Sequence, residues 1–208
     1  MHVLFVCNGN VCRSAIAERL TRALAVEHNL PGLTAESAGT RALVGFPIEP
    51  LAAQAITGLG ADPENFKARK LKPELIDRAD LVLAMTQQLR DQSIDMAFGS
   101  APRTYTLLEA ARIAKVTGAR TIAELHGARN DLSLVGREGI ADPVGLSEAA
   151  YCEVGDRIAD ALVPLLLALA PHEQTHLVDS EVPGLVIQPN SRQAPLSAFL
   201  AAQRAGMR

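Results

Sequence analysis

Aromatic side chains are scarce in this chain: they account for 3% of its 208 residues, and tryptophan is absent. A site that holds its ligand between several aromatic rings is therefore not expected. The formal net charge is −3, so the chain lacks the strong positive charge that marks many nucleic-acid-binding proteins. We expect no nucleic-acid partner.

Cysteines are also few, namely Cys7, Cys12 and Cys152. An odd and sparse set does not make a disulfide framework, and it suits a reducing compartment. The longest apolar run, 158–170, is shorter than a membrane span, and the start of the chain has no basic leader. A cytoplasmic protein without a membrane span is the expectation.

What the sequence does contain is an alternation of strand-like apolar runs and amphipathic helical segments. The expected strands are 2–7, 33–38, 80–85 and 103–108. The expected helices are 14–27, 50–58, 73–78, one from about Gln87, and 147–170, where Pro164 should introduce a kink. This order predicts an α/β fold: a three-layer sandwich with a central four-stranded parallel sheet, whose functional crevice lies at the carboxyl ends of the strands.

Two segments depart from the alternation. Residues 115–140 contain several glycines and predict a helix and loop insertion. From Pro171 onward, proline and polar residues become frequent. We therefore expect one domain over 1–170 and a tail of unassigned role over 171–208, with a short helix at 195–205.

Residues 3–15, VLFVCNGNVCRSA, place Cys7 where the first strand should end and Arg13 where the first helix should begin. The connecting loop consists of Asn8, Gly9, Asn10, Val11 and Cys12. Free backbone N–H groups in such a loop, together with the helix dipole, bind anions, and glycine and asparagine tolerate the left-handed conformations that an N–H cradle needs. Arg13 can bind a phosphate through two parallel N–H donors. The sequence therefore predicts a phosphate-binding loop after the first strand.

The thiol of Cys7 would lie in the positive potential of this loop. Such a potential favours the thiolate, which is the nucleophilic form. The hydroxyl of Ser14 could donate to the thiolate and stabilise it as a leaving group. The alternative is a buried cysteine beside a capping loop, but the C-x5-R-S spacing between a strand and a helix favours catalysis.

The loop CNGNVCRS resembles the C-x-G-N-x-C-R-S signature of the low-molecular-weight protein tyrosine phosphatase family. Further segments resemble the family in the same order along the chain. They are ESAGT (36–40), ALVG (42–45), KAR (67–69), ADLVLAM (79–85) and ADP (141–143). The segment ALVG is similar to bacterial members associated with exopolysaccharide tyrosine kinases. The resemblance covers about residues 1–168 and leaves out the tail.

The resemblance implies a hydrolase that removes phosphate from phosphotyrosine through a phosphocysteine on Cys7, without a metal or another cofactor. It implies Asp142 as the general acid, with Asp131 as a weaker competitor. Asn10 and Ser37 would hold the loop in shape. The expected partners are a phosphotyrosine protein and a tyrosine kinase, and the expected oligomeric state is a monomer or a weak dimer.

The other two cysteines receive separate interpretations. In the family, the second loop cysteine, here Cys12, often forms a reversible disulfide that protects the nucleophile. A small core residue is the alternative for Cys12, and both interpretations stay open. Cys152 is expected to belong to the core.

The chain also departs from the family pattern. Many members line the pocket with aromatic rings, and these are replaced here by Ala42 or Leu43, Val144 and Gly145. Phe46 is then the nearest ring, and Phe66 stands where the family has a loop-bracing histidine. We therefore expect a wide or weakly selective pocket.

Three alternatives to a tyrosine phosphatase stay open: a phosphate- or partner-binding module, an arsenate reductase and a phosphoarginine phosphatase. Cys7, Arg13 and Asp142 together favour an enzyme. No cysteine lies between Cys12 and Cys152, which disfavours the cysteine relay of arsenate reductases. Phosphoarginine phosphatases carry threonine at the position of Val11, so valine favours phosphotyrosine.

Overall fold

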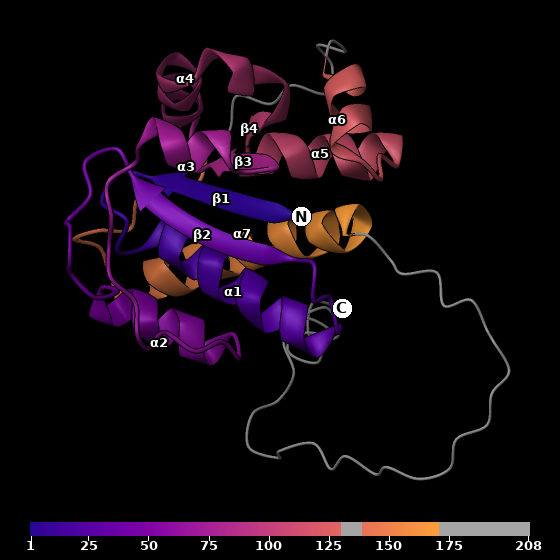
Figure 1. Ribbon diagram of the computed structural model, residues 1–208. Helices are drawn as coiled ribbons and strands as arrows, with labels where there is room; N and C mark the ends of the chain where they lie inside the picture. Colours follow the sequence, from indigo (N-terminus) through magenta and orange to yellow (C-terminus); the bar gives the residue numbers. More distant parts are fainter. Residues whose placement is uncertain (130–138, 171–208) are drawn as a thin grey trace, which may run out of the picture.

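The computed structural model describes residues 1–129 and 139–170. A four-stranded sheet forms the centre of this part (Figure 1). Its strands are β1 (His2–Cys7), β2 (Thr34–Gly39), β3 (Leu81–Ala84) and β4 (Thr104–Thr106). They are all parallel and run in the order β2-β1-β3-β4.

Helices cover both faces of the sheet, which confirms the predicted three-layer α/β fold. On one face lie α1 (Arg13–Glu27), α2 (Pro50–Gly58) and α7 (Glu148–Leu169) (Figure 1). On the other lie α3 (Pro73–Asp77), α4 (Gln87–Met96), α5 (Leu107–Thr117), α6 (Ile122–Ala128) and the 3₁₀ helix η1 (Phe98–Arg103). Because helices cover both faces, the central strands are apolar on both sides: residues 3–6 of β1 have no exposed surface.

The prediction of a strand over 103–108 was wrong at its carboxyl end. β4 stops at Thr106, and α5, which the sequence reasoning missed, begins at Leu107. Thr106 Oγ1 accepts a hydrogen bond from the Glu109 amide at 3.0 Å, and Glu109 Oε2 accepts one from the Thr106 amide at 3.1 Å. This capping box starts a helix immediately after the strand, so apolar Leu107 and Leu108 are helical despite their strand-like context.

The prediction that Cys152 belongs to the core was also wrong. Its side chain is exposed on α7, although the neighbouring Tyr151 is buried. The buried positions of this part of α7 are Tyr151, Val154, Gly155 and Ile158. They follow the helical period, and Cys152 is one residue away from that stripe. The helix itself continues through Pro164.

The described part of the insertion is fastened to β4 by Arg129. Its guanidinium donates to Glu109 Oε1 at 3.1 Å and to the Ala101 carbonyl at 2.7 Å, and it stacks on the Tyr105 ring at 3.9 Å. These contacts fix the end of α6 near the sheet. Asp131 and the helix predicted at 195–205 lie outside the described residues. Among the helices of the described ranges, none is long and apolar enough to cross a membrane.

Candidate active site

The loop between β1 and α1 lies at the carboxyl end of the sheet, where Cys7 pairs in register with Gly39 of β2. Its carbonyl groups turn towards neighbouring segments: Asn8 accepts from the Arg41 amide at 2.9 Å and Gly9 from the Leu43 amide at 3.0 Å. Val11 accepts from the Glu49 amide at 2.8 Å. With its carbonyls held on the outside, the loop leaves its N–H groups for an anion.

Asn10 is the centre of the hydrogen bonds that hold this loop. It is buried and has a left-handed backbone with φ 56°, a conformation that asparagine tolerates. Its Nδ2 donates to Ser14 Oγ at 3.0 Å and to Ser37 Oγ at 2.8 Å. Its Oδ1 accepts from the Arg69 amide at 2.8 Å. Asn10 and Ser37, the two residues expected to hold the loop in shape, are thus hydrogen-bonded to each other.

Sequence reasoning missed two residues that support the loop from behind, Glu18 and Arg69. Ser37 Oγ donates to Glu18 Oε2 at 2.6 Å, and Arg69 Nε donates to the Ser37 carbonyl at 2.8 Å. Glu18 is 4% exposed, and a carboxylate so buried requires partners. The sequence offered one signal for the role of Glu18. It follows Ser14 by four residues, so both side chains lie on the same face of α1.

The thiol of Cys7 is buried in this loop and has two polar neighbours. Its Sγ lies 2.8 Å from Ser14 Oγ and 3.2 Å from the Asn10 amide nitrogen, which donates to it. Both contacts suit a thiolate, because an anionic sulfur accepts hydrogen bonds from a hydroxyl and an amide. Ser14 lies where the sequence predicts it.

Cys12 is buried close to Cys7, and neither thiol is in a disulfide. Burial, and then the charge of Cys7, raise the pKa of Cys12 above its ordinary value. Cys12 is therefore a protonated thiol at neutral pH. The Ser14 hydroxyl and the Asn10 amide contact the sulfur of Cys7 instead.

Arg13 connects the loop to the Asp-Pro segment. Its Nη1 donates to the Ile140 carbonyl at 3.0 Å, and its Nη2 forms an ion pair with Asp142 Oδ2. The Ile140 amide in turn donates to the Met85 carbonyl at 2.7 Å. The Asp-Pro segment is therefore hydrogen-bonded to the residue that directly follows β3. Arg13 Nε is buried and has no hydrogen-bond partner among residues 1–129 and 139–170. The Arg13 guanidinium therefore contacts the Asp142 carboxylate and still has one N–H donor, at Nε, for another anion.

A hollow of about 250 Å³ opens at this point, and its wall is polar. It is lined by Asn8, Arg13, Thr40, Arg41, Thr86, Gln88, Leu89, Gln92 and Asp142. The nearby loops carry exposed apolar side chains, namely Leu43, Val44, Phe46, Val144 and Leu146. Phe46 is 60% exposed and does not line the hollow. The described side chains that line the hollow therefore include no aromatic ring.

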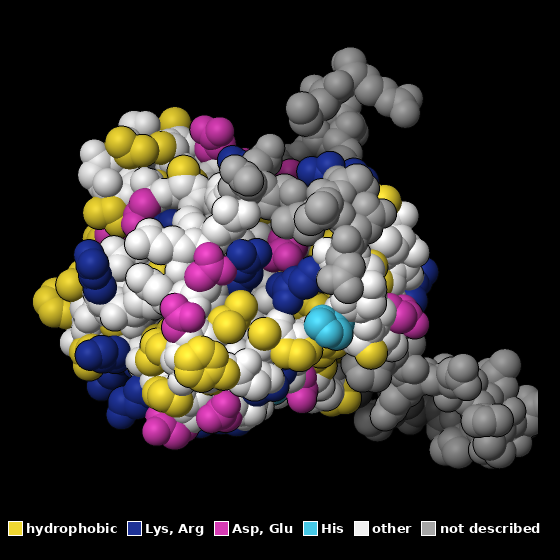
Figure 2. Space-filling model, turned by 90° about the horizontal axis from the view of Figure 1, so that it is seen from above, with side chains coloured by type: hydrophobic (Ala, Val, Ile, Leu, Met, Phe, Trp, Pro, Cys, Tyr) yellow, Lys and Arg dark blue, Asp and Glu magenta, His cyan; other side chains and the backbone are white. Residues whose placement is uncertain are grey.

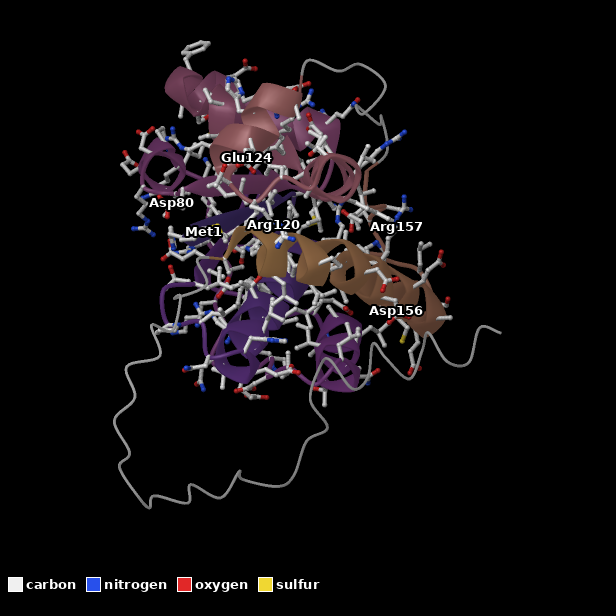
Figure 3. The ribbon with its side chains drawn as sticks, turned by 90° about the vertical axis from the view of Figure 1, so that its right-hand side faces the viewer. Met1, Asp80, Arg120, Glu124, Asp156 and Arg157 are labelled. Carbon is white, nitrogen blue, oxygen red and sulfur yellow. The ribbon has the colours of Figure 1, made fainter. Side chains whose placement is uncertain are left out.

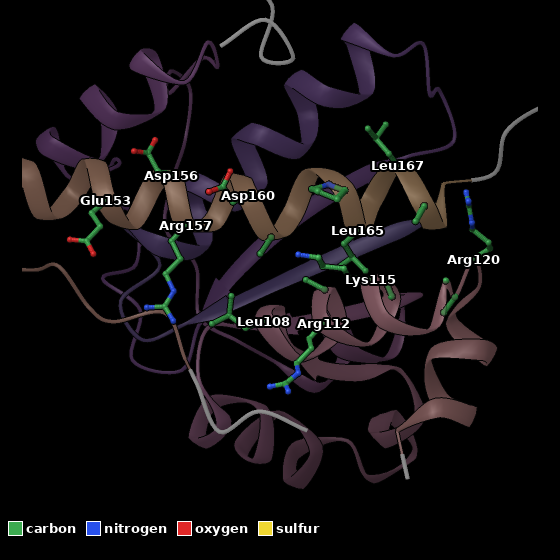
Figure 4. A pocket seen from close by; sticks show the side chains of 17 residues that line it. Leu108, Arg112, Lys115, Arg120, Glu153, Asp156, Arg157, Asp160, Leu165 and Leu167 are labelled. Atoms are coloured by element: carbon green, nitrogen blue, oxygen red, sulfur yellow. The ribbon is translucent and has the colours of Figure 1, made fainter. Parts of the chain in front are cut away.

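Larger hollows lie elsewhere and carry no comparable set of reactive side chains. One of them, about 1200 Å³, is a groove between α5 and α7 with charged side chains of both signs along it (Figure 4). Arg120 belongs to this groove and also lines a second hollow, together with Met1, at the amino-terminal end of the sheet (Figure 3). No group of three or more potential metal ligands occurs within residues 1–129 and 139–170.

Gly39→Ala is expected to disturb the loop, because a Cβ at Gly39 would lie 2.9 Å from the Asn10 nitrogen and would also clash with the Asn8 carbonyl. The overpacking should lower the free energy of unfolding by about 1–3 kcal/mol. A loop displaced by about 1 Å should lower kcat by about 100-fold. Urea denaturation and steady-state kinetics measure the two effects. Gly99→Ala is the matched control, since a Cβ there meets nothing within 4 Å. Unchanged kinetics in Gly39→Ala would contradict the role of this close approach.

Comparison with known proteins places this loop in a family. The family described as low molecular weight phosphotyrosine protein phosphatase matches residues 2–112. The probable low molecular weight protein-tyrosine-phosphatase EpsP of Ralstonia nicotianae is 41% identical over 83 residues, which are 40% of this chain and 54% of EpsP. The chain thus spans about half the length of that relative. The protein-arginine-phosphatase of Bacillus subtilis is 32% identical over 163 residues, which are 78% of this chain and 92% of that protein.

Solved structures agree with the sequence comparison. The low molecular weight protein tyrosine phosphatase of T. tengcongensis has a TM-score of 0.63 at 28% identity, over 80% of this chain and 97% of that one. The YwlE arginine phosphatase of Geobacillus stearothermophilus has a TM-score of 0.59 at 29% identity, over 80% and 90%. With the matching loop, sheet order and relatives, the chain belongs to the low molecular weight phosphotyrosine protein phosphatase family.

Proposed function

We propose that this chain hydrolyses phosphotyrosine and other aryl phosphate monoesters on proteins, through a phosphocysteine on Cys7. One observation carries the proposal: Arg13 follows the loop that holds the Cys7 thiol, and its guanidinium pairs with Asp142. A nucleophile, an anion-binding cation and a carboxyl group are thus available to one phosphoryl group. The names of EpsP and of Etp from Escherichia coli as tyrosine phosphatases support the substrate.

In the first step, the Cys7 thiolate attacks phosphorus in line with the departing oxygen. The P–S bond forms as the P–O bond breaks, and Asp142 gives its proton to the phenolic oxygen. Loop amides and Arg13 hold the equatorial phosphate oxygens, where the transition-state charge lies. A phosphate dianion competes with Asp142 for Arg13, so its arrival frees the carboxyl group for proton transfer.

In the second step, water attacks the phosphocysteine, and Asp142 takes a proton from that water. The P–S bond breaks and the thiolate leaves. The Ser14 hydroxyl, 2.8 Å from Sγ, stabilises the departing sulfur. The catalytic residues are therefore Cys7, Arg13 and Asp142.

The remaining assignments belong to the same proposal. The catalytic domain comprises residues 1–170, with 171–208 as a tail, and the protein acts in the cytoplasm as a monomer or weak dimer. The substrate is a phosphotyrosine protein, with a tyrosine kinase as the opposing enzyme. Cys12, buried beside Cys7, forms a protective disulfide with it under oxidising conditions.

A second candidate is phosphoarginine hydrolysis. It is favoured by the match to the Bacillus subtilis protein-arginine-phosphatase, which spans 78% of this chain. Val11 disfavours it, because a valine offers no hydroxyl to a polar leaving group. The same loop chemistry would serve both substrates, so a direct comparison of substrates decides between them.

The test is steady-state hydrolysis of p-nitrophenyl phosphate, a phosphotyrosine peptide and a phosphoarginine peptide of the same sequence. We expect turnover of the first two, and at least about 100-fold lower kcat/KM for phosphoarginine, because Val11 offers no hydroxyl to its polar leaving group. An assay for arsenate reduction with thiols should be negative. No turnover of any phosphate ester would favour a binding module, and faster phosphoarginine hydrolysis would replace the proposed substrate.

A further inference from the structure

Three exposed cations lie beside the candidate active site. They are Arg41, Lys67 and Lys70, which we call the basic strip. Arg41 lines the catalytic hollow itself. Within the described residues, no ion pair involves any of the three, although the chain as a whole has a formal net charge of −3. Local positive charge on an acidic protein marks a surface for an acidic partner.

Backbone hydrogen bonds fasten the two lysines beside the hollow. The Gly39 amide donates to the Arg69 carbonyl at 3.0 Å, and the Leu71 amide donates to the Gly39 carbonyl at 2.8 Å. The Ala68 amide donates to the Phe46 carbonyl at 2.8 Å. The segment that carries both lysines is therefore held against the end of β2 and the loop that follows it. Lys67 and Lys70 are thus carried by a segment that is bonded to the end of β2 and to the following loop, which contributes Arg41 to the hollow.

Arg69 lies between the two lysines in the chain, but among the described residues its charge is paired within the fold and theirs is not. Arg69 donates to the Ser37 carbonyl and pairs with Glu36 at 3.1 Å, so its charge is used within the fold. Lys67 and Lys70 face solvent on either side of it. Asp62 and Glu64 precede the two lysines in the chain. The negative charge of Asp62 interacts electrostatically with Arg19 of α1.

The basic strip also adjoins exposed apolar side chains. Leu43, Val44 and Phe46 are 50%, 64% and 60% exposed in the loop to which the lysine segment is bonded. In Figure 2, Lys and Arg side chains gather with hydrophobic ones at the left edge, the side on which the strands end in Figure 1. A surface of cations and apolar groups around a phosphate site suits an extended peptide.

We propose that the basic strip binds acidic residues that flank the phosphotyrosine of a protein substrate. The proposal rests on the proposed function and specifies its substrate class: phosphotyrosine within an Asp- and Glu-rich segment. The phosphate enters the loop, and neighbouring carboxylates lie along Arg41, Lys67 and Lys70. Because the strip is exposed, its contribution comes mainly from long-range attraction and falls with salt.

The test compares two phosphotyrosine peptides on the full chain, one with Asp and Glu around the phosphotyrosine and one with Ser and Gln. At low salt we expect kcat/KM about tenfold higher for the acidic peptide, and a loss of this preference at about 0.5 M salt. In the double variant Lys67→Gln/Lys70→Gln the preference should fall to about twofold or less, while p-nitrophenyl phosphate turnover stays unchanged. The matched control is Lys115→Gln/Arg120→Gln, in the α5–α7 groove, which should keep the preference (Figure 4).

The outcomes separate this proposal from the proposed function. The wild type could hydrolyse p-nitrophenyl phosphate and show the same kcat/KM for the acidic peptide as for the Ser and Gln peptide. In that case the basic strip has no docking role, although the phosphatase activity stands. If the control double variant loses the preference as strongly as Lys67→Gln/Lys70→Gln does, overall charge explains it and the proposal is wrong. If no phosphate ester is hydrolysed by the wild type, the proposed function itself fails.

Discussion

Cys7→Ser is expected to reduce the turnover of p-nitrophenyl phosphate by about 10⁴-fold or more, the largest effect of any substitution considered. A serine hydroxyl remains protonated at neutral pH, and its neighbours in the loop are Ser14 Oγ and the Asn10 amide, neither of which is a base. Steady-state kinetics with purified protein measure the effect. Cys152→Ser is the matched control, because this thiol is exposed on α7.

The same variant should still bind inorganic phosphate. The loop amides and Arg13 make the anion site, and the substitution leaves both in place; removal of the thiolate charge can only favour an anion there. Isothermal titration calorimetry with phosphate, at equal protein concentration for both forms, measures this. Equal turnover in Cys7→Ser and wild type would refute the nucleophile, and loss of phosphate binding together with turnover would indicate a collapsed loop instead.

The fold could be predicted from the sequence where one local signal dominates. β1 is apolar from Val3 onward and is followed by a loop with glycine and asparagine, so its end at Cys7 was predicted correctly. α5 was missed because Leu107 and Leu108 directly follow β4, whose threonines and tyrosine favour a strand. The T-x-x-E capping box at Thr106 and Glu109 was the competing signal.

The candidate site likewise has contacts that follow from the local sequence and contacts that do not. Cys7, Arg13 and Ser14 are close in the chain, so their proximity follows from a strand-to-helix loop. Arg69 supports Asn10 through its backbone amide, a contact that does not depend on its side chain and leaves no trace in the residue type. Contacts of this kind depend on the path of the chain between distant segments, which one sequence does not specify.

Asp142→Asn is expected to divide substrates by their leaving groups. Tyrosine has an ordinary pKa of about 10 and leaves poorly as an anion, so loss of the acid should lower kcat/KM on a phosphotyrosine peptide by about 10²–10³-fold. The p-nitrophenolate anion is far more stable and departs with little protonation, so kcat/KM on p-nitrophenyl phosphate, which reports the first chemical step alone, should fall much less. Asp160→Asn, an exposed α7 position, is the matched control.

The ion pair between Asp142 and Arg13 makes a second part of this prediction. Asparagine removes the carboxylate that competes with phosphate for the guanidinium, so Asp142→Asn should bind inorganic phosphate at least as tightly as the wild type. Weaker turnover with tighter phosphate binding would distinguish loss of an acid from damage to the loop, which would weaken both. If kcat/KM falls equally on both esters, Asp142 positions Arg13 and does not give a proton to the leaving group. If kcat/KM on the phosphotyrosine peptide is unchanged, another carboxyl group is the acid, and Asp131→Asn is then the variant to measure.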